Sequence, residues 1–339
     1  MIFLSEIILS VNNLKVNFHM FEGVAKVLDG VSLDIREGET ISLVGETGCG
    51  KSVTIRTILK VLPVPPGRVA EGRILYKGRD LLNMREEEFY KLRGREMSLI
   101  PQEPISSLNP VFTIGDQLTD LILFHGRHRL GWMEWIGKWF GGGRGKCEEA
   151  WNKAIELLEK VNIPDPERVM KSYPIELSGG MCQRVLISMA LAGNPSLLFA
   201  DEPTTALDVT TQDQILQLLE ERMREQRLSV LHITHNLGVA RRIARRIYVM
   251  YVGQIVETAN TKDIFNTPMH PYTRGLLASI PKLTKKPMKG IRGMMPDYTS
   301  PPSGCRFHPR CTHVLPICSK EKPKLIEVNK KHFVACHLY

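Results

Sequence analysis

The sequence predicts an α/β fold built around a parallel sheet, and two observations lead to this prediction. Three short apolar runs, at residues 41–44, 196–200 and 229–234, each end in glycine-rich or polar residues. Strands buried in a parallel sheet show such runs, and functional groups gather at their carboxyl ends. Residues 53–62, after the first loop, are compatible with a helix. With 339 residues and 43% apolar content, the chain can form a large core and one added domain.

The loop after the first run, GETGCGKS at residues 45–52, fits the phosphate-binding pattern G-x-x-x-x-G-K-[ST]. Glycines let backbone N–H groups curl around a β-phosphate, and the following helix start adds partial positive charge. Lys51 is expected to reach the β- and γ-phosphates of ATP, and the Ser52 hydroxyl to bind Mg²⁺. The nucleotide-binding residues predicted here are Gly45, Glu46, Thr47, Gly48, Cys49, Gly50, Lys51, Ser52 and Thr54.

The ends of the other two runs carry candidate catalytic groups. Asp201 is expected to hold Mg²⁺, and Glu202 to orient the attacking water. His235 follows the third run, where an imidazole is suited to grip the γ-phosphate. An acidic strand end without a role and an ordinary surface histidine are the plain alternatives. The context of three strand ends favours catalysis.

Together with LSGGMCQR at residues 177–184, these motifs give residues 7–280 a resemblance to the nucleotide-binding subunits of ABC transporters. The resemblance implies an ABC-type P-loop NTPase: a RecA-like core with an antiparallel β subdomain and an inserted helical subdomain, followed by a small C-terminal Cys-rich domain. The loop at residues 45–52 then corresponds to Walker A, and Asp201 and Glu202 to Walker B. His235 corresponds to the switch histidine.

The same resemblance implies three further nucleotide contacts. Gln102 is the Q-loop residue, catalytic and a Mg²⁺ ligand, and Asp208 of the D-loop, residues 205–208, lies near the nucleotide. Phe18 is similar to the aromatic residue on which adenine stacks, with Phe21 as the competing candidate.

The signature residues Ser178, Gly179 and Gly180 are expected to open a helix whose N–H groups point outward. As in the family, they would contact the γ-phosphate of ATP held by a second, facing ABC ATPase subunit. That subunit is a similar sibling or a second copy of this chain. Hydrolysis then opens the dimer.

Residues 101–110, PQEPISSLNP, and residues 265–273, FNTPMHPYT, resemble the ATPases of oligopeptide and dipeptide importers. The resemblance implies peptide uptake with transmembrane permease subunits and, indirectly, an extracytoplasmic solute-binding protein. In that family the permease's coupling helix lies in a cleft beside the Q-loop, so residues 111–173 are expected to receive it. Subunits of this type also serve oligosaccharide or nickel uptake. A soluble ABC ATPase acting on nucleic acid or ribosomes is less favoured, because the chain has one motif set and no heptads.

The predicted domains are a RecA-like core with its antiparallel β subdomain at 1–110 and 185–260, a helical subdomain with the signature at 111–184, and an importer-type extension at 261–339. Two residues depart from the family pattern: Cys182 replaces a basic residue, and Asn236 replaces an aspartate. They leave open how tightly this cassette grips ATP. A redox-gated binder without hydrolysis is disfavoured by the intact Glu202 and His235.

Charge and hydropathy place this chain beside the membrane. No apolar run approaches the roughly 18 residues of a membrane span, and the first six residues lack a signal peptide's basic region. The membrane-spanning part must therefore come from other chains, and the resemblance to importer ATPases implies a peripheral protein at the cytoplasmic face. Residues 281–339 carry 12 Lys or Arg and 3 acids, a net charge of +9 that equals the excess of the whole chain. Acidic permease loops or anionic lipids are the favoured partners of this tail, and no nucleic acid is expected.

The tail also contains four of the seven cysteines, spaced C-x5-C-x6-C-x17-C: Cys305, Cys311, Cys318 and Cys336. Disulfides are rare in the reducing cytosol, so clustered thiols favour metal. The gaps are too wide for usual zinc pairs, and the peptide-importer resemblance implies a [4Fe–4S] cluster. Zinc with His308, His313 or His337, and unligated thiols, remain alternatives. A structural staple is favoured over redox sensing.

Residues 125–147 contain Trp132, Trp135 and Trp139 at helical spacing. They are expected to pack on the helical subdomain, or else to contact the permease or the membrane interface. Cys49 and Cys147 are interpreted as incidental, although a thiol reagent should inhibit ATP binding if Cys49 is exposed.

Overall fold

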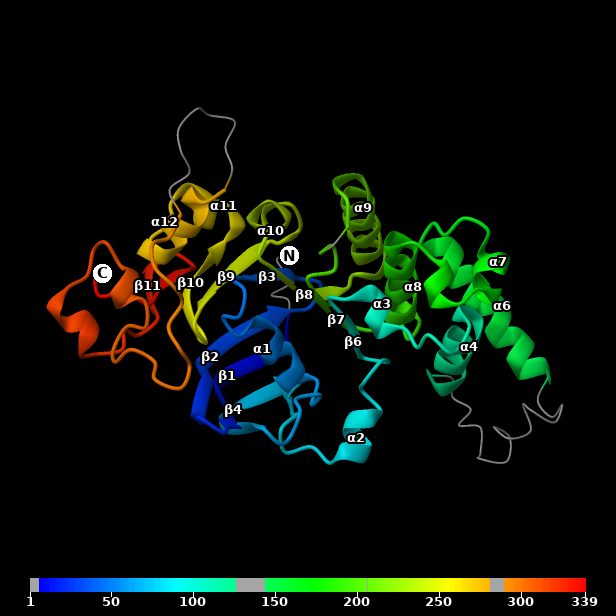
Figure 1. Cartoon of the computed structure of the whole chain (residues 1–339), viewed down its shortest axis with the longest axis horizontal. Helices are drawn as coiled ribbons and strands as arrows, with labels where there is room; N and C mark the ends of the chain where they lie inside the picture. The colour runs from blue at the N-terminus through cyan, green and yellow to red at the C-terminus, as the bar shows by residue number, and fades with distance from the viewer. Residues whose placement is uncertain (1–5, 126–143, 206, 281–289) are drawn as a thin grey trace. The chain divides into compact units, whose positions relative to one another are not determined.

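The structure is a computed structural model that describes residues 6–125, 144–205, 207–280 and 290–339. The chain divides into two compact units. One unit combines Met1–Arg85 with Ser229–Tyr339, and the other is Glu86–Leu228. In Figure 1 the second unit runs from cyan to green, and the first takes the blue, yellow and red ends of the chain.

The first unit contains an antiparallel sheet with strand order β2-β1-β4-β5. Its strands are β1 (Ile7–Met20), β2 (Gly23–Arg36), β4 (Gly67–Tyr76) and β5 (Arg79–Asp80). Along β1, Leu9, Val11, Leu14 and Val16 are buried. The irregular interval between Val11 and Leu14 coincides with register shifts in the pairing of β1 with both neighbours. These bulges turn all four apolar side chains toward the core.

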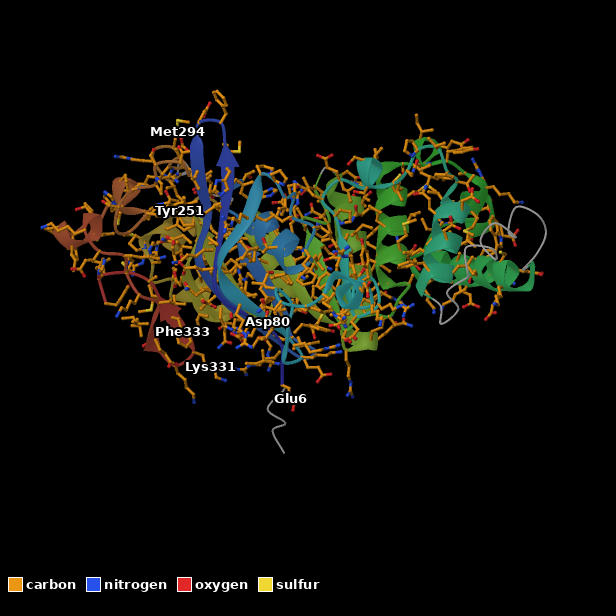
Figure 2. The ribbon with its side chains drawn as sticks, turned by 90° about the horizontal axis from the view of Figure 1, so that it is seen from below. Glu6, Asp80, Tyr251, Met294, Lys331 and Phe333 are labelled. Atoms are coloured by element: carbon orange, nitrogen blue, oxygen red, sulfur yellow. The ribbon has the colours of Figure 1, made fainter. Side chains whose placement is uncertain are left out.

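The second sheet of this unit is built on the predicted parallel strands. β3 (Thr40–Val44) pairs in parallel with β8 (Ser229–Thr234) on one side and with β9 (Arg246–Tyr251) on the other. Antiparallel strands β10 (Gln254–Asn260), β12 (His332–Val334) and β11 (Ile326–Asn329) extend it beyond β9. The end of the chain is therefore part of this sheet, as the labelled Lys331 and Phe333 show in Figure 2.

An aromatic cluster joins the C-terminal residues to this sheet. The ring of Tyr251 lies 4.6 Å from that of Tyr272 and 5.1 Å from that of Phe307, centroid to centroid, and all three side chains are buried. Such pairs add to the free energy of burial. The helices of this unit are α1 (Lys51–Ile58), α10 (Leu237–Ile243), α11 (Thr261–Asn266) and α12 (Pro271–Ala278).

The second unit pairs two parallel strands with a set of helices. β6 (Met97–Ile100) lies beside β7 (Leu197–Asp201), and all five residues of β7 are buried. Leu118, Ala154, Leu158 and Val185 belong to the buried apolar residues contributed by its helices. These helices are α2 (Glu86–Tyr90), α3 (Pro104–Ser107), α4 (Ile114–His125), α6 (Arg144–Lys160), α7 (Pro166–Lys171), α8 (Gly179–Leu191) and α9 (Val209–Gln226).

Two further sequence predictions concern the three tryptophan residues and the lack of a membrane-spanning segment. Trp132, Trp135 and Trp139 lie outside the described residues. Among the residues that the structure does describe, no helix has both the length and the apolar character required to cross a bilayer.

Candidate nucleotide-binding site

The predicted phosphate loop connects β3 to α1 and is tightly fixed in the first unit. A Cβ on Gly45 would stand 2.2 Å from the main-chain oxygen of Met250, so only glycine fits there. The amide of Gly253 donates to the Cys49 oxygen at 2.8 Å. The loop therefore has a defined shape before any ligand binds, which lowers the entropic cost of holding a phosphate.

Lys51 begins α1 and folds back over the loop. Its amine donates to the main-chain oxygens of Gly45 at 2.9 Å and Glu46 at 3.0 Å, and the residue is 5% exposed. These carbonyl contacts hold the cation near the backbone N–H groups of the loop. Thr54 is fully buried, and its hydroxyl donates to the Gly50 oxygen, so it closes the first turn of α1.

The other predicted residues of this unit lie on strand ends. Phe18 is partly exposed near the end of β1, paired with Ala25, while Phe21 in the following turn is fully exposed. His235 is exposed immediately after β8. At Asn236, where the family pattern has aspartate, the side chain accepts from the amides of Gly238 and Val239 and caps α10. An aspartate would cap the helix equally well.

In the second unit, two predicted catalytic residues lie together. Asp201 is the last residue of β7, and Glu202 follows it with a φ of 48°. A Glu202 carboxylate oxygen accepts from the Gln102 amide at 3.4 Å and from the Thr205 hydroxyl at 3.0 Å. Non-glycine residues in this left-handed region concentrate at functional sites. Sequence reasoning missed the contact of Thr205, although the residue belongs to the predicted D-loop.

The signature residues open a helix, as predicted. Ser178 caps α8, and its hydroxyl accepts from the Met181 amide at 3.3 Å. Gly180 packs so closely on α9 that a Cβ would stand 2.7 Å from the methyl of Thr211. Asp208 caps α9 by accepting from the Thr211 amide at 2.9 Å. Hydrogen bonds with the Thr211 side chain and then with its amide lower the pKa of the Asp208 carboxyl. A cap role for Asp208 is visible here, in addition to the predicted nucleotide role.

Cys182, the other departure from the family pattern, faces the interior. Its residue is fully buried, and its thiol lies 3.6 Å from the Pro174 oxygen. Burial raises the pKa of this thiol. The substitution therefore places a buried thiol on the packed side of α8.

The metal site predicted for the C-terminal cysteines is wrong. Cys305, Cys311, Cys318 and Cys336 are free, and the described residues, which include all four, contain no group of three or more His, Cys, Asp or Glu able to hold a metal ion. Burial raises the pKa of Cys305 to about 11. The iron–sulfur, zinc and Cys-rich metal-domain predictions are corrected accordingly. Aromatic packing and pairing of β12 with β10 attach this region instead.

Comparisons with known proteins agree with the motif geometry. The ABC transporter family matches residues 28–205, more than half of the chain. This chain belongs to the ABC transporter family. The oligopeptide/dipeptide transporter C-terminal region matches residues 256–318. The resemblance predicted from the sequence is therefore confirmed, and the cassette is an ABC-type ATPase.

Two relatives resemble the cassette over nearly its whole length. The oligopeptide transport ATP-binding protein OppD of Bacillus subtilis is 43% identical over 330 residues, covering 96% of this chain and 87% of the relative. The dipeptide transport ATP-binding protein DppD of Caldanaerobacter subterraneus is 44% identical over 335 residues, covering 98% and 97%. A dimeric ATP-binding cassette with ADP and Pi has 28% identity and a TM-score of 0.63, covering 75% of this chain and 98% of its own.

Proposed function

We propose that this cassette hydrolyses ATP to drive uptake of oligopeptides or dipeptides through separate membrane subunits, from the cytoplasmic face. The match of residues 256–318 to the oligopeptide/dipeptide transporter C-terminal region carries the substrate class. The names of the relatives, which are oligopeptide and dipeptide transport ATP-binding proteins, agree with it. Oligosaccharide and nickel uptake have no such support in these comparisons.

The proposed chemistry assigns one role to each group. The loop at residues 45–52 binds the phosphates of ATP, with Lys51 on the β- and γ-phosphates. Thr54 stabilises the loop through the hydrogen bond from its hydroxyl to the Gly50 oxygen. Mg²⁺ enters with ATP as the substrate complex. The oxygens of Ser52, Gln102 and Asp201 are the hard ligands that this ion prefers.

Glu202 is the proposed catalytic carboxylate. It orients the water that attacks the γ-phosphorus, a bond forms to that phosphorus, and the β–γ oxygen bond breaks to release ADP. The carboxylate accepts the water's proton. Gln102 and Thr205 hold Glu202 by hydrogen bonds to one of its carboxylate oxygens. His235 contacts the γ-phosphate and stabilises the charge on its oxygens.

The remaining predicted residues complete the nucleotide contacts. Phe18 stacks on adenine, with Phe21 as the alternative, because both lie at the same hairpin and are at least partly exposed. Ser178, Gly179 and Gly180, with Asp208, face ATP held by a second cassette, a sibling or another copy. The dimeric cassette with ADP and Pi supports this arrangement by similarity.

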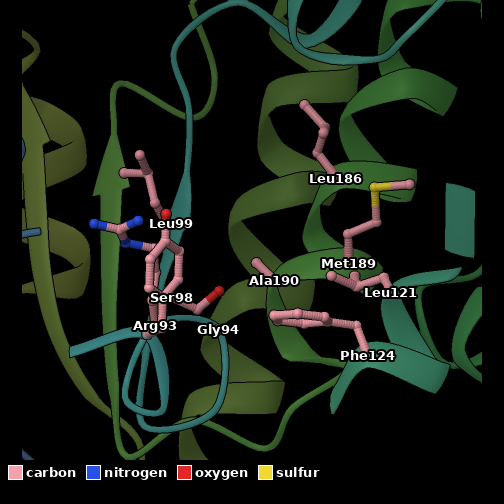
Figure 3. A pocket seen from close by; sticks show the side chains of 10 residues that line it. Arg93, Gly94, Ser98, Leu99, Leu121, Phe124, Leu186, Met189 and Ala190 are labelled. Atoms are coloured by element: carbon pink, nitrogen blue, oxygen red, sulfur yellow. The ribbon is translucent and has the colours of Figure 1, made fainter. Parts of the chain in front are cut away.

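A pocket within the second unit is the proposed contact for a permease helix. It has a volume of about 350 Å³ and is lined mainly by apolar side chains, among them Leu121, Phe124, Leu186 and Met189 (Figure 3). Phe124 is 62% exposed, so its ring is accessible to a docking segment. Leu99 of β6 also lines the pocket, three residues before Gln102, so docking there would reach the Q-loop.

One substitution tests the catalytic part. Glu202→Gln should lower ATP turnover by about 100-fold or more while the Kd for ATP changes little, because positioning of water is lost and the phosphate loop stays intact. The matched control is Glu221→Gln, which removes an equal charge from an exposed site of α9. Unchanged turnover in Glu202→Gln would exclude this residue as the catalytic carboxylate.

The transport part is tested with the whole complex. Membrane subunits that co-purify with the cassette are placed in proteoliposomes, and uptake of a radiolabelled tripeptide is compared with uptake of a trisaccharide and of Ni²⁺. We expect ATP-dependent uptake of the tripeptide alone. Phe124→Ser should reduce co-purification, whereas Ile175→Ser, which truncates an even more exposed apolar residue outside the pocket, should not.

A further inference from the structure

Residues 290–310, here called the strap, run along the edge of β2 beside the phosphate loop. The amide of Lys26 on β2 donates to the Tyr298 oxygen at 2.8 Å. The Arg306 guanidinium donates to the oxygens of Lys26 at 3.2 Å and Val252 at 2.6 Å. The N–H and the C=O group of Lys26 thus both bind the strap, and these hydrogen bonds fix the strap next to the phosphate loop. Met294 and Tyr251, labelled in Figure 2, mark this part of the first unit.

Two strap side chains bind the phosphate loop directly. The Tyr298 hydroxyl donates to the Gly48 oxygen at 2.7 Å. The Arg310 guanidinium donates to both carboxylate oxygens of Glu46, at 2.7 and 3.0 Å. Glu46 and Gly48 are separated by one residue, so both contacts act on the same turn of the loop. Met295 lies near Gly48 as well, 3.2 Å from where a Cβ would stand.

Arg310 is itself rigidly held. Its side chain is only 5% exposed, its Nε donates to the Arg292 oxygen at 2.9 Å, and its guanidinium lies over the Tyr251 ring. Glu46 is held a second time, since its amide donates to the Tyr272 hydroxyl at 2.9 Å. A two-bond Arg–carboxylate contact between fixed partners is the strong form of a salt bridge.

The charge of Glu46 makes this contact relevant to the ligand. A carboxylate inside a phosphate loop repels the negative charges of ATP, and the repulsion grows when water is excluded. The Arg310 guanidinium balances that charge and fixes the position of the carboxylate. The Tyr298 contact uses a carbonyl oxygen and therefore occupies none of the loop amides that a phosphate would need.

We propose that Arg310 and Tyr298 are positioning residues for ATP binding, through which the C-terminal extension sets the nucleotide affinity of the phosphate loop. The inference rests on the proposed function, because the ligand whose affinity they set is ATP. The inference adds Arg310 and Tyr298 to the residues that determine ATP binding. They lie 264 and 250 positions away in sequence from the loop residues that they contact.

The test uses the full-length cassette and a fluorescent ATP analogue. Arg310→Gln should raise the Kd for the analogue and the KM for ATP about tenfold, the usual effect of losing a charged hydrogen-bonded pair. Tyr298→Phe, which removes only the hydroxyl, should raise both about threefold. The kcat of each variant, measured at saturating ATP, should lie within about twofold of the wild-type kcat, because neither residue touches the reacting atoms. Arg310→Lys keeps the charge and should lie between wild type and Arg310→Gln.

Two controls separate positioning from a general loss of structure. Lys322→Gln removes an equal charge from the same extension, where Lys322 binds Asp29 and not the loop, and should leave Kd and KM unchanged. In a Glu46→Gln background, Arg310→Gln should change Kd by less than about twofold, because the charge that it balances is gone.

The outcomes are distinguishable. A folded Arg310→Gln with wild-type Kd, or an equal rise in Kd for Lys322→Gln, would overturn the inference. If Arg310→Gln does not fold, Tyr298→Phe and Arg310→Lys decide by the same criteria. A wild-type cassette that neither binds nor hydrolyses ATP would instead refute the proposed function.

Discussion

The methyl group of Thr211 on α9 lies 2.7 Å from the position that a Cβ on Gly180 would occupy. The signature glycine is therefore constrained from within its own unit, independently of any nucleotide. Packing and the proposed contact with ATP require the same residue, and a compensating substitution can separate the two requirements.

Gly180→Ala should lower the free energy of unfolding by about 1–3 kcal/mol, because the added methyl overpacks the contact with Thr211. Adding Thr211→Ser removes the clashing methyl and should recover most of this loss in denaturant unfolding. The ATPase activity of the double variant should stay at least about tenfold below wild type if Gly180 also faces ATP. Full recovery of activity would reduce Gly180 to a packing residue.

Thr205 should control turnover through Glu202. Its hydroxyl donates to the carboxylate at 3.0 Å, so Thr205→Val removes the donor at nearly constant volume. We expect kcat to fall about tenfold with little change in the KM for ATP, because the residue orients the carboxylate and does not bind nucleotide. Thr205→Ser keeps the hydroxyl and should retain most of the activity. A rise in KM without loss of kcat would contradict this role.

Two buried histidines should make the cassette sensitive to acid. Burial lowers the pKa of His232 to about 3 and that of His270 to about 3, and His270 Nδ1 also accepts from the Tyr272 amide at 3.0 Å. Below pH 6.5 the unfolded chain binds protons that the folded chain excludes. The free energy of unfolding should therefore fall by about 1.4 kcal/mol per pH unit for each histidine between pH 6.5 and 3.

His270→Asn tests this prediction, because asparagine still caps α12 but does not titrate. Denaturant unfolding at pH 7, 6, 5 and 4 should give a shallower decline for the variant than for wild type. Parallel declines would show that His270 is protonated in the folded state.

Thiol reagents should spare the phosphate loop. Cys49 is fully buried, and burial raises the pKa of its thiol, so it is a poor nucleophile at neutral pH. With the native cassette, N-ethylmaleimide should label Cys147, which is partly exposed, before Cys49. ATP binding should persist during that first labelling, as mass spectrometry and analogue binding would show. The sequence analysis expected a thiol reagent to inhibit ATP binding only if Cys49 is exposed, and Cys49 is buried.

The phosphate loop, the strand ends and the signature helix start were predictable because each depends on local chemistry. A strand, a glycine-rich turn and Lys51 lie within a few residues, and Ser178 caps the helix that it precedes. Asn236 is a local feature whose role the sequence analysis did not predict. Its departure from the family pattern raised a question about ATP binding, and its structural role as a helix cap required only a short polar side chain.

The other features depended on long-range packing, which spacing does not encode. Nothing near Glu46 indicates that Arg310 pairs with it, 264 residues later. The four C-terminal cysteines suggested a metal site, yet burial and geometry decide whether thiols can act as ligands. Basic residues in the same tail were interpreted only as partner contacts, whereas Arg306 and Arg310 are nearly buried within the first unit.

The attachment of the chain's end to β10 has a consequence for biosynthesis. β12, which pairs with β10, comprises residues 332–334, and the strap at residues 290–310 precedes it in the chain. A ribosome must therefore synthesise the strap, 250 to 264 residues after the loop residues that it contacts, before the phosphate loop acquires its final support. Prematurely terminated products would carry every recognised cassette motif and still lack a properly braced nucleotide cradle.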